Sequence, residues 1–292
     1  MTLERVLTPL LQLVARHQPL AVRATEFDLL AGRSDLGAIT CGSESFVFQT
    51  SDRIIGRILW REGNRFLDRL DRVVQALGAK FELETLVEVG ANIGIVCIPA
   101  VKRWIARRAI AIEPVPTNCR LLRANIVLNG VEDRIATHQI ALGAESNTSV
   151  LFELSPDNSG DHRVHLGASG GLQGEGARQT IELPSTRYDD LVPALDPATT
   201  LIWMEAQGAE GHILQGAPRA LDRRTPLLVE FCPYLIERCG SRAPFEEAAL
   251  RYSSFLDVRR SDTAFEPMTK AALDAVWARL GTRGSYTDLL MC

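Results

Sequence analysis

The chain has 292 residues, of which 46% are hydrophobic and 23% are charged, and its formal net charge is −4 at pH 7. This composition is typical of a globular protein with a sizeable core. The acidic balance lacks the basic surface that nucleic-acid binding favours, so we expect no nucleic-acid partner. No window offers the roughly 18 apolar residues that a membrane span needs, so we expect no membrane partner.

The six cysteines form no CxxC pair and stand at no zinc-ligand spacing with a histidine. We therefore expect reduced, structural thiols, no metal site and a cytoplasmic protein. The first residues carry Glu4 and place apolar side chains at helical spacing, which predicts an amphipathic helix rather than a signal peptide.

Residues 1–80 have the pattern of an extension of helices and strands ahead of the main domain. Within it, the apolar runs 45–49 and 54–59 predict short strands. Helical spacing returns over 65–77, where the apolar residues recur every three or four positions.

The main domain is expected over 81–292, where strands alternate with helices. Strands are predicted at 85–89, 108–112, 135–142, 200–205 and 226–231, and helices at 95–104, 116–128 and from the fourth strand to residue 220. This alternation predicts an α/β fold with a doubly wound, mainly parallel sheet.

An insertion is expected over 144–199, where that rhythm stops. Its flanks, 149–154 and 179–183, predict the strands of a hairpin, and the glycine-rich stretch 167–176 predicts a mobile loop. The last residues, 285–292, have the composition of an edge strand.

The clearest motif is EVGANIG at residues 88–94, between the first strand and its helix. Gly90 and Gly94 allow a tight turn and close approach of a ligand, with Glu88 and Asn92 beside them. The spacing lacks the middle glycine of the dinucleotide fingerprint GxGxxG, which disfavours a pyrophosphate in this turn. A simple strand–helix turn is the alternative.

Small and acidic residues end the next two strands. Glu113, followed by Pro114, closes the second strand, where a carboxylate accepts hydrogen bonds from the hydroxyls of an adenosine ribose in related folds. Ala141 and Leu142 close the third strand and suit the flat face of an adenine. The alternative for Glu113 is a surface carboxylate at the end of a strand.

The segment WMEAQGAE at residues 203–210 closes the fourth strand and puts Glu205 at the carboxyl edge of the sheet, where ligands bind in open α/β folds. Here the sequence resembles the FkbM family of S-adenosylmethionine-dependent methyltransferases. The resemblance covers roughly residues 85–231 and rests on a series of segments in family order: VGANIG, IEP with Asn118 and Asn125, ALG, the pair Asn158 and Gly160, QGAE, and LVEF.

The chain departs from the family at two positions in the same segment. The family usually has aspartate where this chain has Glu205, and often glutamate where it has Gln207. The first departure keeps the negative charge at the strand end.

The resemblance implies a Rossmann-like class I methyltransferase that uses S-adenosylmethionine to methylate a hydroxyl of a sugar or secondary metabolite. It implies that Asn118 belongs with the cofactor residues, and a small-molecule or glycan acceptor is expected. An alcohol is a weak nucleophile, so a positioned base would help. Glu205 and His212 are the candidates, against the alternatives of a structural carboxylate and a surface histidine.

The candidates for acceptor contact are Asn158, His162 and Glu230. Glu230 ends the fifth strand, where it lines the acceptor side or caps the sheet, and His162 lies with His165 in the insertion. Two other functions remain open at this point: a nicotinamide-dependent oxidoreductase, and a binding protein that keeps the cofactor fold without catalysis.

Overall fold

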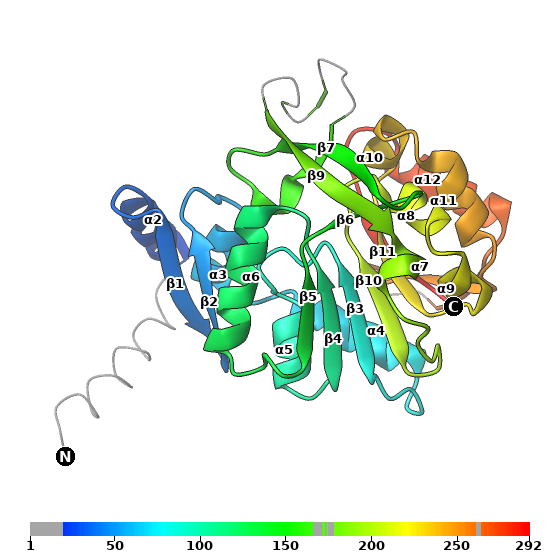
Figure 1. Ribbon diagram of the computed structural model, residues 1–292, viewed down its shortest axis with the longest axis horizontal. Coiled ribbons are helices and arrows are strands. Elements are labelled where there is room, and N and C mark those ends of the chain that lie inside the picture. Colours follow the sequence, from blue (N-terminus) through cyan, green and yellow to red (C-terminus); the bar gives the residue numbers. More distant parts are fainter. Residues whose placement is uncertain (1–19, 166–170, 173, 175–177, 261–263) are drawn as a thin grey trace.

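The computed structural model describes residues 20–165, 171, 172, 174, 178–260 and 264–292 (Figure 1). Its centre is an eight-stranded sheet with the order β13-β12-β14-β11-β10-β3-β4-β5. Five of these strands run parallel: β3 (Thr85–Val89), β4 (Arg108–Ile112), β5 (Ile135–His138), β10 (Thr200–Met204) and β11 (Leu227–Phe231). One edge adds β14 (Thr287–Met291), β12 (Ser254–Asp257) and β13 (Glu266–Pro267).

The strand order reverses between β3 and β10. The chain passes from β3 to β4 and β5 on one side, and then returns to β10 and β11 on the other. This arrangement confirms the predicted α/β fold with a doubly wound, mainly parallel sheet. Ligands in such sheets bind outside the carboxyl ends of the strands at the point of reversal, which directs attention to the ends of β3 and β10.

Alternate residues of each strand face two separate cores, as the period of two requires. In β10, Trp203 packs in one core and Met204 in the other. The Trp203 core is covered by α4 (Leu67–Leu77), α5 (Cys97–Lys102) and α6 (Pro116–Leu128). The Met204 core is covered by α8 (Glu210–Gln215), α9 (Pro218–Asp222), α10 (Pro233–Arg238), α11 (Arg242–Ala249) and α12 (Lys270–Leu280). Burial on both faces explains the nearly continuous apolar runs of the parallel strands.

A second sheet, drawn above the first in Figure 1, has the order β6-β9-β7-β8. Its strands are β6 (Ala141–Gly143), β7 (Thr148–Leu154), β8 (Arg163–Val164) and β9 (Gln179–Arg187), and the short helix α7 (Tyr188–Leu191) follows. β7 and β9 pair antiparallel along the whole of β7, which confirms the two hairpin strands. The chain between them includes the short 3-10 helix η1 (Ser159–Asp161).

The N-terminal segment contains α2 (Leu20–Ala31), the hairpin of β1 (Leu36–Cys41) and β2 (Glu44–Gln49), and α3 (Ile55–Glu62). The hairpin docks on α6 through amide side chains. Asn125 accepts a hydrogen bond from the backbone N–H of Val47 at 2.7 Å, and Asn129 accepts one from Ser45 at 3.0 Å. These asparagines satisfy backbone groups along β2, so the segment is fixed against the main sheet.

One predicted strand in this segment is wrong, because residues 54–59 begin the helix α3. The side chain of Asp52 accepts hydrogen bonds from the backbone N–H groups of Ile54 and Ile55, at 2.9 and 2.8 Å, and so starts the helix. A short apolar run fits a strand and a buried helix equally well, and here the polar residue ahead of the run decides between them.

Two other strands differ in extent or place. The strand predicted over 135–142 ends at His138, and the chain resumes as β6 in the second sheet. The C-terminal strand β14 is not an edge strand, because it lies between β11 and β12 and all five of its residues are buried.

The helix expected at the N-terminus and most of the glycine-rich stretch 167–176 lie outside the described residues. Within the part of the chain that is described, no helix is both long enough and apolar enough to cross a bilayer.

Candidate active site

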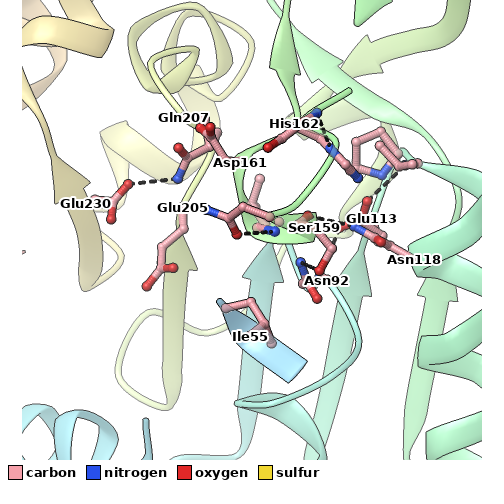
Figure 2. A pocket seen from close by; sticks show the side chains of 18 of the residues that line it. Ile55, Asn92, Glu113, Asn118, Ser159, Asp161, His162, Glu205, Gln207 and Glu230 are labelled. Carbon is pink, nitrogen blue, oxygen red and sulfur yellow. Dashed lines mark hydrogen bonds between the residues drawn. The ribbon is translucent and has the colours of Figure 1, made fainter. Parts of the chain in front are cut away.

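A cavity of about 760 Å³ opens at the carboxyl ends of the parallel strands, beside the reversal of strand order. We divide its lining into two parts. The β4 side is formed by Asn92, Pro114 and Asn118 around Glu113, and by Ala141, Leu142 and Phe152. The β10 side is formed by Phe66 and Arg69 around Glu205, and by Gln207, Glu230 and Tyr286. In Figure 2, Glu113 and Asn118 lie on one side, and Glu205, Gln207 and Glu230 lie on the other.

The floor between the two sides is the turn after β3, where Gly90 has a φ of 86°. A Cβ added to Gly90 would overlap the backbone carbonyl oxygen of Glu205, so the turns after β3 and β10 pack backbone against backbone. Only glycine meets both requirements, a left-handed φ and no side chain.

Glu113 is the centre of the β4 side. Its two carboxyl oxygens accept hydrogen bonds from the backbone N–H groups of Asn92 and Val115, at 2.8 and 2.9 Å. Burial nevertheless raises the pKa of the Glu113 carboxyl to about 7, against the opposing effect of these donors. Each oxygen has a further lone pair, so the carboxylate is held in place and still able to accept bonds from a ligand.

A second polar group lies next to Glu113. Asn118 donates a hydrogen bond to the carbonyl oxygen of Ser159 at 3.0 Å, while its own oxygen, Oδ1, is buried without a partner among the described residues. An unpaired buried acceptor is costly, so this oxygen suits a ligand that brings a donor. Pro114, Ala141 and Leu142 give the same side an apolar surface.

The 3-10 helix η1 forms a cover that joins the β4 side to the N-terminal segment. The hydroxyl of Ser159 bonds to the carboxylate of Asp52, and Asn92 donates to the same hydroxyl at 3.4 Å. The backbone N–H of Arg53 also donates to the carbonyl oxygen of Asp157 at 2.7 Å. Residues ahead of the main sheet therefore hold the loop that encloses this part of the cavity.

The β10 side is organised by Glu205 and a buried arginine from α4. Nη1 of Arg69 lies 2.8 Å from Oε1 of Glu205 and 3.0 Å from Oδ2 of Asp288. Nε1 of Trp203 donates to the same oxygen of Glu205 at 3.2 Å, and the Arg69 guanidinium lies over the Trp203 ring at 5.1 Å. Oε1 thus holds two donors, while no donor from the described residues reaches Oε2.

Gln207 and Glu230 form the neighbouring pair, drawn in Figure 2 with their hydrogen bond. Nε2 of Gln207 lies 3.0 Å from Oε2 of Glu230, and Gln207 adopts a left-handed φ of 51°. A non-glycine residue in this region stores strain that the surrounding structure must hold, and such residues cluster at functional sites. The strained turn after β10 directs the Gln207 amide into the cavity.

Several carboxyl groups meet near this pair, and their pKa values show the consequence. Burial, with the charges of Glu205 and Glu113, raises the pKa of Glu88 to about 8. Burial and the charges of Glu205 and Asp288 raise the pKa of Glu230 well above its ordinary value. Burial and mutual repulsion therefore favour the protonated forms of these carboxyl groups, and a cation in the cavity would favour their ionised forms instead.

The insertion contributes two of the predicted acceptor residues. Asn158 accepts a hydrogen bond from the backbone N–H of Gly160 at 3.0 Å and so caps the 3-10 helix. Nδ1 of His162 accepts from the backbone N–H of Ser155 at 3.0 Å, and burial with the charge of Arg178 lowers the His162 pKa to about 4. His162 is then neutral at pH 7 with its proton on Nε2, so it offers the cavity a donor.

Two predicted residues lie away from the cavity. The ring of His212 bonds to the carbonyl oxygen of Cys239 at 2.9 Å, outside the cavity lining. Gly94 lies against Ile98 and Leu122, so its lack of a side chain serves packing rather than ligand contact. The other predicted site residues all line the cavity.

Sequence reasoning missed Arg69, which lines the cavity, and it missed Asp52 and Asp288, which lie behind the lining and bind the lining residues Ser159 and Arg69. Arg69 lies on a helix whose pattern indicates only an apolar face, and Asp288 lies in a strand whose other residues are core. Asp288 could have been found from the sequence, because a charged residue inside an otherwise apolar strand is rarely buried without a partner and so indicates an ion pair.

The sequence matches the family described as the Methyltransferase FkbM domain over residues 88–264, more than half of the chain. The chain belongs to the FkbM methyltransferase domain family. It is an S-adenosylmethionine-dependent methyltransferase, and this assignment replaces both the oxidoreductase and the non-catalytic alternatives. Among curated proteins, none matches the sequence.

Solved structures with a similar fold include methyltransferases with several acceptors in their names. An FkbM methyltransferase from Methylobacillus flagellatus KT has 16% identity and a TM-score of 0.45, over 93% of this chain and 58% of its own. The tRNA m1G37 methyltransferase of M. jannaschii has 13% identity and a TM-score of 0.43, over 89% and 54%. TYW2 of M. jannaschii, in complex with AdoMet, has 12% identity and a TM-score of 0.41, over 89% and 85%. At these identities the similarity concerns the fold alone and does not identify the acceptor of the present chain.

Proposed function

We propose that this methyltransferase O-methylates a hydroxyl group of a small-molecule or glycan acceptor, with Glu205 as the base. The observation that carries the proposal is that Glu205 lines the cavity while its Oε1 is held by Arg69 at 2.8 Å, so that Oε2 has no donor among the described residues. A hydroxyl is a poor nucleophile unless its proton is removed as it reacts, and a carboxylate in this position meets that need.

The β4 side fits the adenosine part of S-adenosylmethionine. Glu113 would accept hydrogen bonds from the ribose hydroxyls, and the orphaned Oδ1 of Asn118 would accept one from a ligand donor. Pro114, Ala141 and Leu142 would pack against the adenine. The negative charge of the β10 side suits the sulfonium, because a cation lowers the repulsion among the carboxylates.

The cofactor supplies an electrophilic methyl group, and the residues of the β10 side prepare the acceptor. The acceptor oxygen would take the methyl group that S-adenosylmethionine supplies when bound, S-adenosylhomocysteine would be the other product, and Oε2 of Glu205 would accept the hydroxyl proton. Gln207 and Glu230 would orient a neighbouring polar group of the acceptor through hydrogen bonds. Burial raises the pKa of Glu230, which favours its protonated form as a hydrogen-bond donor to the acceptor.

The surroundings of Glu205 favour a neutral acceptor with an apolar face. Ile54, Ile58, Phe66 and Tyr286 line the same cavity as Glu205 and Glu230. A polyanionic acceptor such as a nucleic acid would bring phosphates towards these carboxylates, which is electrostatically unfavourable. The proposal therefore favours glycans and hydroxylated metabolites over RNA.

The test is methyl transfer from methyl-labelled S-adenosylmethionine to a panel of acceptors. The panel contains methyl glycosides, oligosaccharides and hydroxylated aromatic and alicyclic compounds, with primary amines and a transfer RNA as competitors. We expect label in alkali-stable methyl ethers, and a loss of transfer in Glu205→Gln. Methylation of the amines or the RNA, without any of a hydroxyl, would contradict the proposal.

A further inference from the structure

The N-terminal segment supplies an arginine to the β10 side. α4 lies ahead of the region that matches the FkbM family, yet its residue Arg69 reaches the end of β10. Its side chain is 14% exposed and lies between Trp203 and the two carboxylates Glu205 and Asp288. Asp288 comes from β14, beyond the other end of the matched region.

We propose that Arg69 is a positioning residue that keeps Glu205 ionised and aimed at the acceptor, with Asp288 competing for the same guanidinium. The inference rests on the proposed role of Glu205 as the base. One nitrogen atom, Nη1, lies 2.8 Å from Oε1 of Glu205 and 3.0 and 3.1 Å from the oxygens of Asp288. The charge that Arg69 offers is therefore divided between the two carboxylates, although Asp288 has a second cation in Arg259, whose Nε lies 2.6 Å from its Oδ2.

Glu205 needs such a partner because acidic groups surround it. The charged and titratable groups that interact with it come from five elements: Arg69 (α4), Glu88 (β3), Glu210 (α8), Glu230 (β11) and Asp288 (β14). Four of these five groups are acidic, and Arg69 is the cation among them. An ion pair within hydrogen-bond distance favours the charged form of a carboxyl, whereas like charges favour the neutral form.

Geometry adds a second effect to the charge. Oε1 of Glu205 is held by Arg69 and by Nε1 of Trp203, while the guanidinium itself lies over the Trp203 ring. These contacts fix the carboxylate so that Oε2 remains open to the cavity. Burial lowers the pKa of Arg69, but the charges of Glu205 and Asp288 outweigh it and raise that pKa above its ordinary value, so the guanidinium stays charged.

Two substitutions are expected to move the ionisation of Glu205 in opposite directions. Arg69→Met removes the cation, so the titration midpoint of Glu205 should move upward by about one to three pH units. Arg69→Lys keeps the positive charge, so the titration midpoint of Glu205 in this variant should lie close to that of the parent protein. Asp288→Asn removes the competing carboxylate while keeping its shape, so the midpoint should move downward.

The measurement is a carboxyl ¹³C NMR titration of glutamate-labelled protein bound to S-adenosylhomocysteine, with the Glu205 signal assigned by its loss in Glu205→Gln. The matched control is Arg65→Met, since Arg65 lies just ahead of the same helix and pairs only with Glu62 among the described residues. It should leave the midpoint unchanged. If Arg69→Met does not fold, the inference is tested by Asp288→Asn, in which the titration midpoint of Glu205 should lie below that of the parent protein.

A second arm follows kcat/KM against pH for the methyl glycoside or other hydroxyl compound that the panel shows to be methylated. The acidic limb should move with the NMR midpoint, and Arg69→Met should recover turnover at high pH. An unmoved midpoint in folded Arg69→Met and Asp288→Asn, or an equal loss of rate at every pH, would overturn the inference. Normal turnover in Glu205→Gln would instead refute the proposed base, whatever the NMR titration shows.

Discussion

The two sides of the cavity are built in different ways. The β4 side comes mostly from one stretch of chain, residues 88–142, in which each strand is followed at once by its ligand-facing turn. The β10 side brings together Arg69, Glu205 and Asp288, which are separated by more than 80 residues at each step. The first is a product of the fold's repeating unit, and the second depends on segments at both ends of the chain.

This difference concerns the two ligands that the cavity would hold. The turns after β3 and β4, which would hold the cofactor, are set by short-range geometry, such as the positive φ of Gly90. The β10 side is completed by α4 and by β14, which lie outside the residues that match the family. Substitutions on the two sides should therefore separate cofactor affinity from turnover.

The largest effect is expected for Glu205→Gln, which tests the β10 side. Turnover should fall about 10²–10⁴-fold, the usual contribution of a general base, because glutamine cannot take the hydroxyl proton. Affinity for S-adenosylhomocysteine should change less than twofold, since Glu205 is not among the β4 side residues. Initial rates and isothermal calorimetry give the two quantities. A parallel loss of rate and affinity would mean that Glu205 serves the cofactor instead.

The contrast between the sides also explains what the sequence could predict. Gly90, Glu113 and Leu142 each end a strand in a periodic pattern, and this periodicity leads directly to the sheet's carboxyl edge. His212 follows the same motif as Glu205, but spacing along the chain does not tell which way a side chain on a short helix points. Arg69 carries no local pattern, and Asp288 shows only that a charge lies inside a buried strand, because the partners of both residues are set by long-range packing.

The predicted fold shows the same limit. Parallel strands buried on both faces leave an unmistakable apolar run, so β3, β4, β10 and β11 were predicted. Residues 54–59 form an equally apolar run, but tertiary contacts and the hydrogen bonds that Asp52 accepts from the backbone of Ile54 and Ile55 make them helical. The interior position of β14 depends on which strand it meets, and sequence periodicity does not encode that neighbour.

The next effect is on the β4 side, where Glu113→Ala should weaken binding of S-adenosylhomocysteine by about 1–3 kcal/mol, the scale of hydrogen bonds to a charged acceptor. Glu113 is buried at the end of its strand, so thermal melting must show that the variant is folded. Glu182→Ala, on the exposed face of β9, is the matched control and should bind normally. Unchanged affinity in folded Glu113→Ala would remove this residue from the cofactor site.

A smaller and graded effect is expected from pH. The pKa of Glu113 is about 7 in the free protein, and the ionised form is the better acceptor for ribose hydroxyls. Affinity for S-adenosylhomocysteine should be constant above pH 7 and fall about tenfold per pH unit below it, as linkage to one proton requires. Glu113→Gln should flatten this dependence. Tighter binding at acid pH would show that the protonated carboxyl is the bound form.

The smallest effect is expected for His212→Ala. His212 lies just after the segment 203–210 that contains Glu205, but it does not line the cavity. Its ring bonds to the carbonyl oxygen of Cys239, which ties α8 to the end of α10, so its loss should lower the free energy of unfolding by about 0.5–1.5 kcal/mol. Turnover by the remaining folded enzyme should stay within twofold of the parent. Glu205 and His212 lie seven residues apart in the sequence, but only Glu205 lines the cavity. Comparing the two variants therefore tests whether turnover depends on a side chain in the cavity or only on proximity along the chain. A large loss of turnover in folded His212→Ala would mean that α8 moves its histidine into the cavity when the acceptor binds.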